Sequence, residues 1–224
     1  LEDFSHAFNI QNDAAPYSLT TLPLEYSTLM GGDYRTPAYA VRNGHGQLIG
    51  NLKFDHYQIL AGNESFNGTL PTARTPHGQT LIITMHDETQ TLAVRLKYTI
   101  VGDLPVLLKQ VEYRNLTDTT LTITHAASLQ LDFDDHAYDL ITLTGAHLNE
   151  AKVTRQPLTP GKKSIGSNYG ASGPQGVPAT ILAAPATNEF AGEALGVTLL
   201  WSGNFNYTAP VSYTHLTLPT KLEV

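Results

Sequence analysis

The sequence predicts an all-β protein. Every second residue is apolar over several segments, most plainly at residues 92–100, which is typical of a strand with one buried face. Threonine, whose β-branched side chain fits a pleated sheet, is abundant, and no segment keeps a helical period. Turn residues separate the segments at a spacing of roughly 8–12 residues. For a chain of 224 residues without an obvious linker, this pattern favours one large sandwich of two antiparallel sheets.

The first strands are expected before residue 62. Residues 39–42 form a short apolar segment, and Asn43-Gly44-His45-Gly46 follows it as a hairpin turn of the Asn-Gly type. Residues 48–60 then predict one long strand, in which Gly50 marks a bulge. The pattern therefore starts with a hairpin that leads into a long strand.

The middle of the chain shows the strongest alternation. In residues 92–100, the face that begins at Leu92 is expected in the core and the face of Arg95 and Lys97 in solvent. Residues 106–114 continue as a strand whose apolar face is interrupted by Lys109. Turns are expected after these two strands, at Gly102-Asp103-Leu104-Pro105 and Asn115-Leu116-Thr117-Asp118.

The second half of the chain shows a less regular alternation of apolar and polar residues. Half-buried segments are expected around Leu121 to Ile123 and Leu129 to Phe133, with later strands at 138–146 and 195–200. Residues 187–195 are the best helical segment, but it is short and contains a glycine. Residues 157–178 form the longest irregular stretch, and loops of that length are usually functional or contact a partner.

Composition excludes several classes of protein. The chain is 41% hydrophobic and 15% charged, which rules out intrinsic disorder. Its apolar runs are far shorter than the ~20 residues of a membrane span. A net charge of −7 argues against a nucleic-acid or anionic-membrane partner, and the absence of cysteine excludes disulfides, thiolate zinc sites and a cysteine nucleophile.

Most catalytic motifs are missing from the chain. No Gly-x-Ser-x-Gly elbow occurs, and the nine histidines include no His-x-x-x-His pair. Gly161-Lys162-Lys163-Ser164 lacks the upstream glycine of a phosphate loop and is interpreted as a solvated turn. Asp132-Phe133-Asp134-Asp135-His136 is interpreted as a charged strand end, because calcium needs six or more oxygen ligands. No metal or cofactor is expected.

Four segments stand out together, and two shorter ones accompany them. They are Gly32-Asp33-Tyr34-Arg35-Thr36-Pro37-Ala38, Tyr138-Asp139-Leu140-Ile141-Thr142-Leu143-Thr144-Gly145-Ala146, Tyr169-Gly170-Ala171-Ser172 and Leu195-Gly196-Val197-Thr198-Leu199-Leu200-Trp201-Ser202-Gly203-Asn204-Phe205, with Leu22-Pro23-Leu24-Glu25-Tyr26 and Thr154-Arg155-Gln156-Pro157-Leu158. In this order and spacing, the chain resembles the N-terminal domain of α-galactosidases of glycoside hydrolase family 36, the melibiase/raffinase type. The likeness covers essentially residues 1–205.

The resemblance implies a fold and a set of partners. The domain would be a large antiparallel β-supersandwich related to galactose mutarotase, followed in the parent chain by a (β/α)₈ barrel. A retaining mechanism would use two Asp residues, both in the barrel, so this chain would be non-catalytic. The parent would be a bacterial, cytoplasmic homo-oligomer that hydrolyses terminal α-D-galactosides such as melibiose and raffinose-type oligosaccharides.

The resemblance also implies which residues here contact the sugar. Asp3, in the extreme N-terminal run, would accept hydrogen bonds from galactose hydroxyls. An alternative alignment on Phe8 places Ser5 there instead. Asp33 and Arg35 would contact substrate or form an ion pair that fixes their loop. A departure follows Ser172, where the family's Ser-His-x-x-Asn-Pro-Phe is replaced by Gly173-Pro174-Gln175-Gly176-Val177-Pro178.

The two ends are expected to differ from a natural gene product. Val211-Ser212-Tyr213-Thr214-His215-Leu216-Thr217-Leu218-Pro219-Thr220 is similar, residue for residue, to one reading frame of a common transposase-based sequencing adapter. Residues 1–210 are therefore expected to be the β-supersandwich, without its true N-terminus, and residues 211–224 a non-native tail.

Two other functions compete with the α-galactosidase domain. One is a free-standing sandwich that binds carbohydrate, although the single tryptophan makes aromatic stacking on sugars less favourable. The other is a mutarotase-like epimerase that uses a histidine acid and a carboxylate base, for which His125, His147 and Glu150 are the nominal residues.

Overall fold

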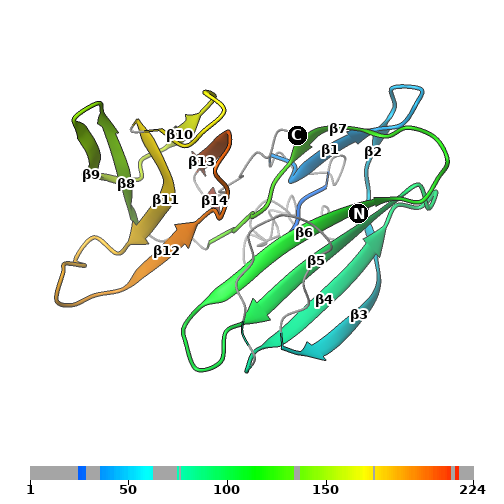
Figure 1. Cartoon of the computed structure of the whole chain (residues 1–224), viewed down its shortest axis with the longest axis horizontal. Coiled ribbons are helices and arrows are strands. Elements are labelled where there is room, and N and C mark those ends of the chain that lie inside the picture. The colour runs from blue at the N-terminus through cyan, green and yellow to red at the C-terminus, as the bar shows by residue number, and fades with distance from the viewer. Residues whose placement is uncertain are drawn as a thin grey trace, which may run out of the picture.

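The computed structural model describes residues 25–28, 36–62, 75, 77–133, 137–173, 175–212 and 215–216. All regular elements in these ranges are strands, paired antiparallel, and they form two lobes (Figure 1). The all-β supersandwich class predicted above is confirmed. Within the same ranges, no helix is long and apolar enough to cross a membrane.

The first lobe packs a three-stranded sheet on a four-stranded one. The smaller sheet has the order β2-β1-β7, and the larger has the order β3-β4-β5-β6. Their bounds are β1 Tyr39–Arg42, β2 Leu48–Ile49, β3 Lys53–Ala61, β4 Gln79–His86, β5 Leu92–Ile100, β6 Leu107–Asn115 and β7 Thr122–Ala126.

The second lobe repeats this plan with the rest of the chain. Its sheets have the orders β12-β11-β8-β9 and β10-β13-β14. The bounds are β8 Asp139–Ala146, β9 Asn149–Pro157, β10 Gly161–Ser167, β11 Gly176–Ala183, β12 Ala194–Thr198, β13 Phe205–Ser212 and β14 His215–Leu216. The strands of the supersandwich are thus divided among four sheets, two in each lobe.

Each lobe has a hydrophobic core of its own. The first core centres on Tyr39, Val94 and Leu96 between its two sheets. The second centres on Leu182, Phe205 and Tyr207. The covalent connection between the lobes contributes to both, because Ala127 belongs to the first core, whereas Leu129, Leu131 and Phe133 pack against the second.

The Asn-Gly hairpin and the strongest strands are confirmed. The Asn43 amide donates to the Gln47 carbonyl at 2.9 Å, and Gly46 closes the turn with a φ of 77°. Strand β5 has the predicted bounds. Its second face, however, is not solvated as predicted: Lys97 and Thr99 are buried, and the Thr99 and Thr80 hydroxyls are hydrogen-bonded at 2.8 Å. On the same face Arg95 donates to the Glu112 carboxylate at 2.7 Å, and such hydrogen bonds are what allow polar side chains to be buried.

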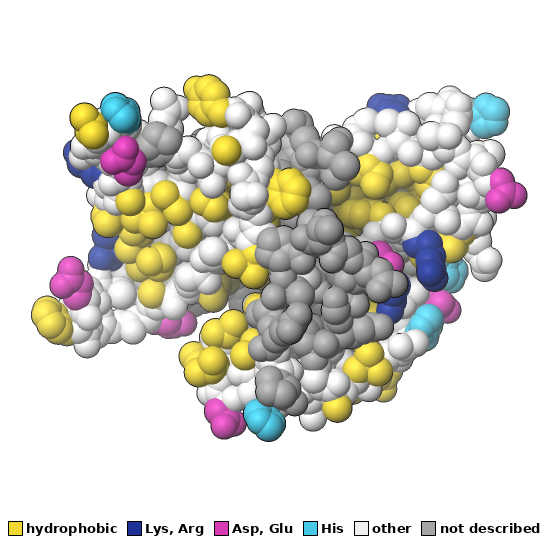
Figure 2. All heavy atoms as spheres, in the orientation of Figure 1, with side chains coloured by type: hydrophobic (Ala, Val, Ile, Leu, Met, Phe, Trp, Pro, Cys, Tyr) yellow, Lys and Arg dark blue, Asp and Glu magenta, His cyan; other side chains and the backbone are white. Residues whose placement is uncertain are grey.

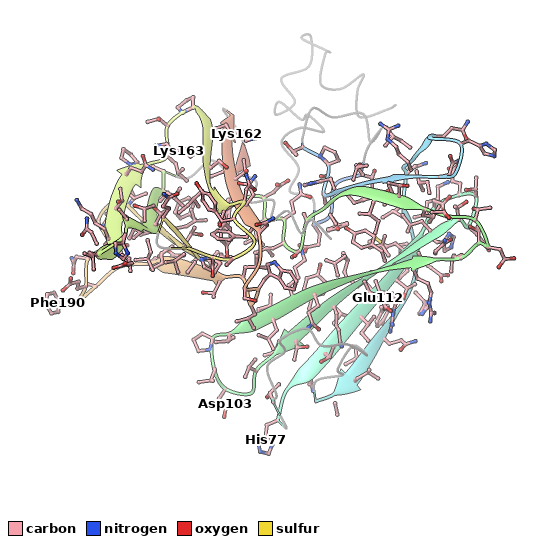
Figure 3. All side chains as sticks on the ribbon, turned by 45° about the horizontal axis from the view of Figure 1, so that its top comes forward. His77, Asp103, Glu112, Lys162, Lys163 and Phe190 are labelled. Atoms are coloured by element: carbon pink, nitrogen blue, oxygen red, sulfur yellow. The ribbon has the colours of Figure 1, made fainter. Side chains whose placement is uncertain are left out.

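Three other predictions were wrong. The long strand at residues 48–60 is divided near Asn51, whose φ of 58° ends β2, and β3 then joins a different sheet. The stretch 157–178 contains β10, and Lys162 and Lys163 lie in this strand in place of the predicted turn (Figure 3). Residues 187–193 form no helix but belong to the loop between β11 and β12.

Candidate functional site

The three residues predicted to contact sugar, Asp3, Asp33 and Arg35, lie outside the described residues, and their roles stay predictions. The structure does describe both sides of the segment that contains Asp33 and Arg35, at residues 25–28 and from residue 36 onward. The groups that hold these two sides form the best-defined polar cluster of the first lobe.

Hydrogen bonds join the two sides of that segment. The Ala38 amide donates to the Ser27 carbonyl at 2.9 Å, and the Ser27 hydroxyl lies 2.9 Å from the Thr36 carbonyl. The side-chain oxygen of Gln130 accepts from the Ser27 amide, also at 2.9 Å. Gln130 is fully buried, so it ties the start of the segment to the connection between the lobes.

Lys109 is the charged centre of the cluster. Its ammonium group contacts the Glu25 carboxylate and lies 5.2 Å from the Tyr98 ring centroid and 5.9 Å from that of Tyr26. Tyr98 donates to the same carboxylate at 2.5 Å. Burial lowers the pKa of Lys109, and the Glu25 carboxylate partly offsets this effect. The arrangement compensates a nearly buried cation with one anion and two aromatic faces.

A row of tyrosines extends the cluster into the core. The Tyr26 and Tyr39 rings stack with centroids 6.1 Å apart and an interplanar angle of 3°, and Tyr113 lies 6.3 Å from Tyr39. The hydroxyls of Tyr26 and Tyr113 are hydrogen-bonded to each other. Burial raises the pKa of Tyr113 to about 12, and it is also the largest cause of the raised pKa values of Tyr26, Tyr39 and Tyr98.

The chemistry of this cluster is structural. It contains one carboxylate, whereas hydrolysis of a glycosidic bond uses two. Among the described residues, no group of three or more His, Asp or Glu side chains could hold a metal ion. The cluster therefore holds residues 25–28 and 36–38 against the first core, and its described side chains do not pair a nucleophile with a general acid.

Arg155, from the Thr154–Leu158 motif, performs a similar role in the second lobe. Its Nε donates to Asp139 at 2.7 Å, and its other nitrogens donate to the carbonyls of Ala184, Pro185 and Thr187 at 2.6–3.1 Å. One guanidinium thus holds the loop 184–193 against β8 and β9. Sequence analysis included Arg155 in a motif but gave it no role.

Two of the other predicted segments meet in the second lobe. The Gly170 amide donates to the Asn204 side chain at 2.6 Å, and the Ser172 amide donates to the Ser202 carbonyl at 3.1 Å. A side chain at position 203 would lie within 2.6 Å of the Trp201 ring nitrogen, which explains the glycine there. The Tyr169–Ser172 and Ser202–Asn204 segments therefore form one packed surface turn.

The nominal epimerase residues do not share a site. His125 belongs to β7 in the first lobe, whereas His147 lies in the turn between β8 and β9 of the second lobe and Glu150 near the start of β9 (Figure 1). The Glu150 carboxylate accepts from the Leu148 amide at 2.9 Å, which stabilises that turn.

Two antiparallel lobes, each with two sheets around its own core and charged groups that hold loop ends in place, define the class as a β-sandwich domain. The sequence model of the glycosyl hydrolase family 36 N-terminal domain matches residues 2–218. The chain belongs to this family, which confirms the resemblance drawn from the motifs. The matched range passes residue 210, and the assignment of residues 211–224 to an adapter stays a prediction.

Relatives and solved structures give the same assignment. Alpha-galactosidase 2 of Pediococcus pentosaceus is 39% identical over 98% of this chain, and Alpha-galactosidase Mel36A of Lactobacillus acidophilus is 38% identical over 85%. The α-galactosidase of Lactobacillus brevis superposes with a TM-score of 0.87 at 34% identity, over 95% of this chain and 29% of that one. The chain spans 31% and 26% of the two relatives' lengths.

Proposed function

We propose that this chain is the non-catalytic N-terminal domain of a retaining α-galactosidase. One observation carries the proposal: the similarity extends over 98% of this chain but only 31% of the P. pentosaceus relative. Retention requires two carboxyl groups ~5–5.5 Å apart across the scissile bond. In this proposal the (β/α)₈ barrel, which follows in the parent chain, provides both of them.

The proposed substrates are terminal α-D-galactosides, namely melibiose and raffinose-type oligosaccharides. In support, α-galactosidase AgaA of Geobacillus stearothermophilus, 30% identical to this chain, has been solved in complex with raffinose and with stachyose. The described part of this chain contributes the fixed ends of the segment that carries Asp33 and Arg35. Asp3, Asp33 and Arg35 are proposed to contact galactose in a homo-oligomeric parent.

The proposal is tested with the purified chain and with its parent gene. The chain alone should show no turnover of a chromogenic α-galactoside, and the source DNA should continue past the Ala209 codon into a barrel-coding frame. The full-length product should hydrolyse the same substrate with retention. Turnover by the chain alone, or a stop codon after Ala209, would overturn the assignment.

The sugar contacts require a separate measurement on the full-length enzyme. Asp33→Asn and Asp3→Asn should each raise KM for melibiose at least about tenfold, since charge-assisted hydrogen bonds are worth about 1.5–3 kcal/mol. An unchanged KM for both variants would assign these residues to the structure of their loops. Light scattering on the same preparations gives the oligomeric state.

A further inference from the structure

Two central strands of the second lobe each carry adjacent apolar residues that point to opposite faces, although the paired, buried Thr142 and Thr180 share the core-side face. Leu140 of β8 and Leu182 of β11 enter the second core, and the next residues, Ile141 and Ile181, face the other way as direct partners in the sheet. A sheet with one solvated face alternates apolar with polar residues, whereas runs of apolar residues are typical of strands covered on both faces. The sequence of β8 and β11 thus predicts a cover on each side.

Within the part of the chain that the structure describes, the second core covers one of these faces and the other is left open. We call the open one the outer face; Arg155 and Thr198 lie on it by register, and its apolar and small residues are Ile141, Leu143, Val153, Ala179, Ile181 and Gly196. Val153 is 65% exposed and Ile181 40%. A Cβ placed on Gly196 would meet nothing within 4 Å, so the sheet surface beside Ile181 is bare. Figure 2 shows hydrophobic side chains gathered over this lobe.

One end of the outer face is bordered by a preorganised loop. Arg155 lies opposite Ile141 in the register of β8 and β9. Its guanidinium donates hydrogen bonds to the loop 184–193, and the Asp139 carboxylate compensates its charge. The Thr187 hydroxyl and the Asn188 side chain bond to backbone groups of the same loop. Phe190 projects from its tip at 95% exposure (Figure 3). A loop already held in one conformation loses little entropy when it contacts a partner.

We propose that the outer face is the docking surface for the catalytic module of the parent chain, so this inference rests on the proposed function. The relatives are about three times as long as this chain, and the additional length is the polypeptide that could cover the face. A covalently joined module has a high effective concentration, so a small apolar surface is enough to hold it. A separate copy of the chain would need roughly 20–30 residues on each side, far more than the six apolar and small residues of this face.

Neighbouring residues on β9 allow a matched test. Val153 lies on the outer face, and Thr154 is exposed on the opposite face of the same strand. Val153→Asp should lower the Tm of the full-length parent by at least about 5 °C and leave the Tm of this chain alone unchanged. Thr154→Asp introduces the same charge into the same strand and should affect both proteins equally. Ile181→Asp provides a second substitution on the outer face.

Each result decides the proposal. A Tm of the parent that is insensitive to Val153→Asp and Ile181→Asp would overturn it, as would equal losses in the parent and in the chain alone. A chain that is dimeric by light scattering and becomes monomeric with Val153→Asp would assign the face to a second copy instead. These outcomes are distinct from failure of the proposed function, because an active full-length parent can still show no effect of either substitution.

Discussion

At the scale of single residues, Lys109 is an exception to the sequence pattern whose environment only the structure identifies. It interrupts the apolar face of a strand that otherwise carries Val111 and Tyr113. Tyr98 faces Lys109 across the β5–β6 hairpin, but Glu25 could not be predicted as the partner, because it lies 84 residues away in the sequence. Gln130 gave no comparable signal, since one glutamine in an irregular segment has no pattern to break.

The buried tyrosines predict sensitivity to high pH. The pKa of Tyr113 is about 12 in the folded chain, against about 10 when unfolded, so its stabilising effect is complete below pH 10 and is lost between pH 10 and 12. The raised pKa values of Tyr26, Tyr39 and Tyr98 act with the same sign. The pKa of Lys109 is lowered, so its charged form destabilises the folded chain, and this destabilisation disappears as the pH rises and Lys109 loses its proton. The four tyrosines outweigh it above pH 10.

Urea unfolding at pH 8, 10 and 11 measures this effect. The free energy of unfolding should fall above pH 10, and Tyr113→Phe should make the fall shallower by about 1 kcal/mol per pH unit. At pH 8 the same substitution should cost about 1 kcal/mol through the lost hydrogen bond to Tyr26. Tyr57→Phe is the control, because Tyr57 is 62% exposed and should leave the slope unchanged. Equal slopes for the wild type and Tyr113→Phe would contradict the prediction.

At the scale of elements, alternation predicted strands well and sheets poorly. The bounds of β5 and the hairpin at Asn43 followed from period-two patterning and turn chemistry. The division at Asn51 did not, because asparagine tolerates a positive φ without any change in the apolar pattern on either side. Strand β10 was missed because its Gly-Lys-Lys-Ser start and exposed residues imitate a turn. Which sheet a strand joins depends on contacts that are distant in sequence.

Arg155 should control the order of a whole loop. Arg155→Met removes the hydrogen bonds to the carbonyls of residues 184–187 and leaves Asp139, which is largely buried, without its cation. We expect a loss of about 1–3 kcal/mol in the free energy of unfolding and faster amide exchange across residues 184–193. Lys152→Met removes a charge from an exposed position of the same strand and should change neither quantity. Unchanged exchange in Arg155→Met would show that the loop is held by its own turns.

At the scale of the whole molecule, the division into two cores was not predictable from patterning. A single sandwich and two lobes, each with a four-stranded and a three-stranded sheet, produce the same alternation along the chain. Alternation shows that one face of a strand is buried, but it does not show which core that face joins. The motif resemblance reached the family correctly, since it depended on residue identities at fixed spacing. The division matters for stability, because each core buries its own set of side chains.

Separate cores predict that the chain unfolds in two steps. Leu92 belongs to the first core and Leu182 to the second, and each is 1% exposed. Replacing either by alanine should cost about 2–5 kcal/mol and lower the midpoint of one calorimetric transition by on the order of 10 °C, while the other stays in place. One transition that both variants lower equally would contradict this expectation. It would mean that the connection from Ala127 to Phe133, which contacts both cores, couples the lobes strongly enough for them to unfold together.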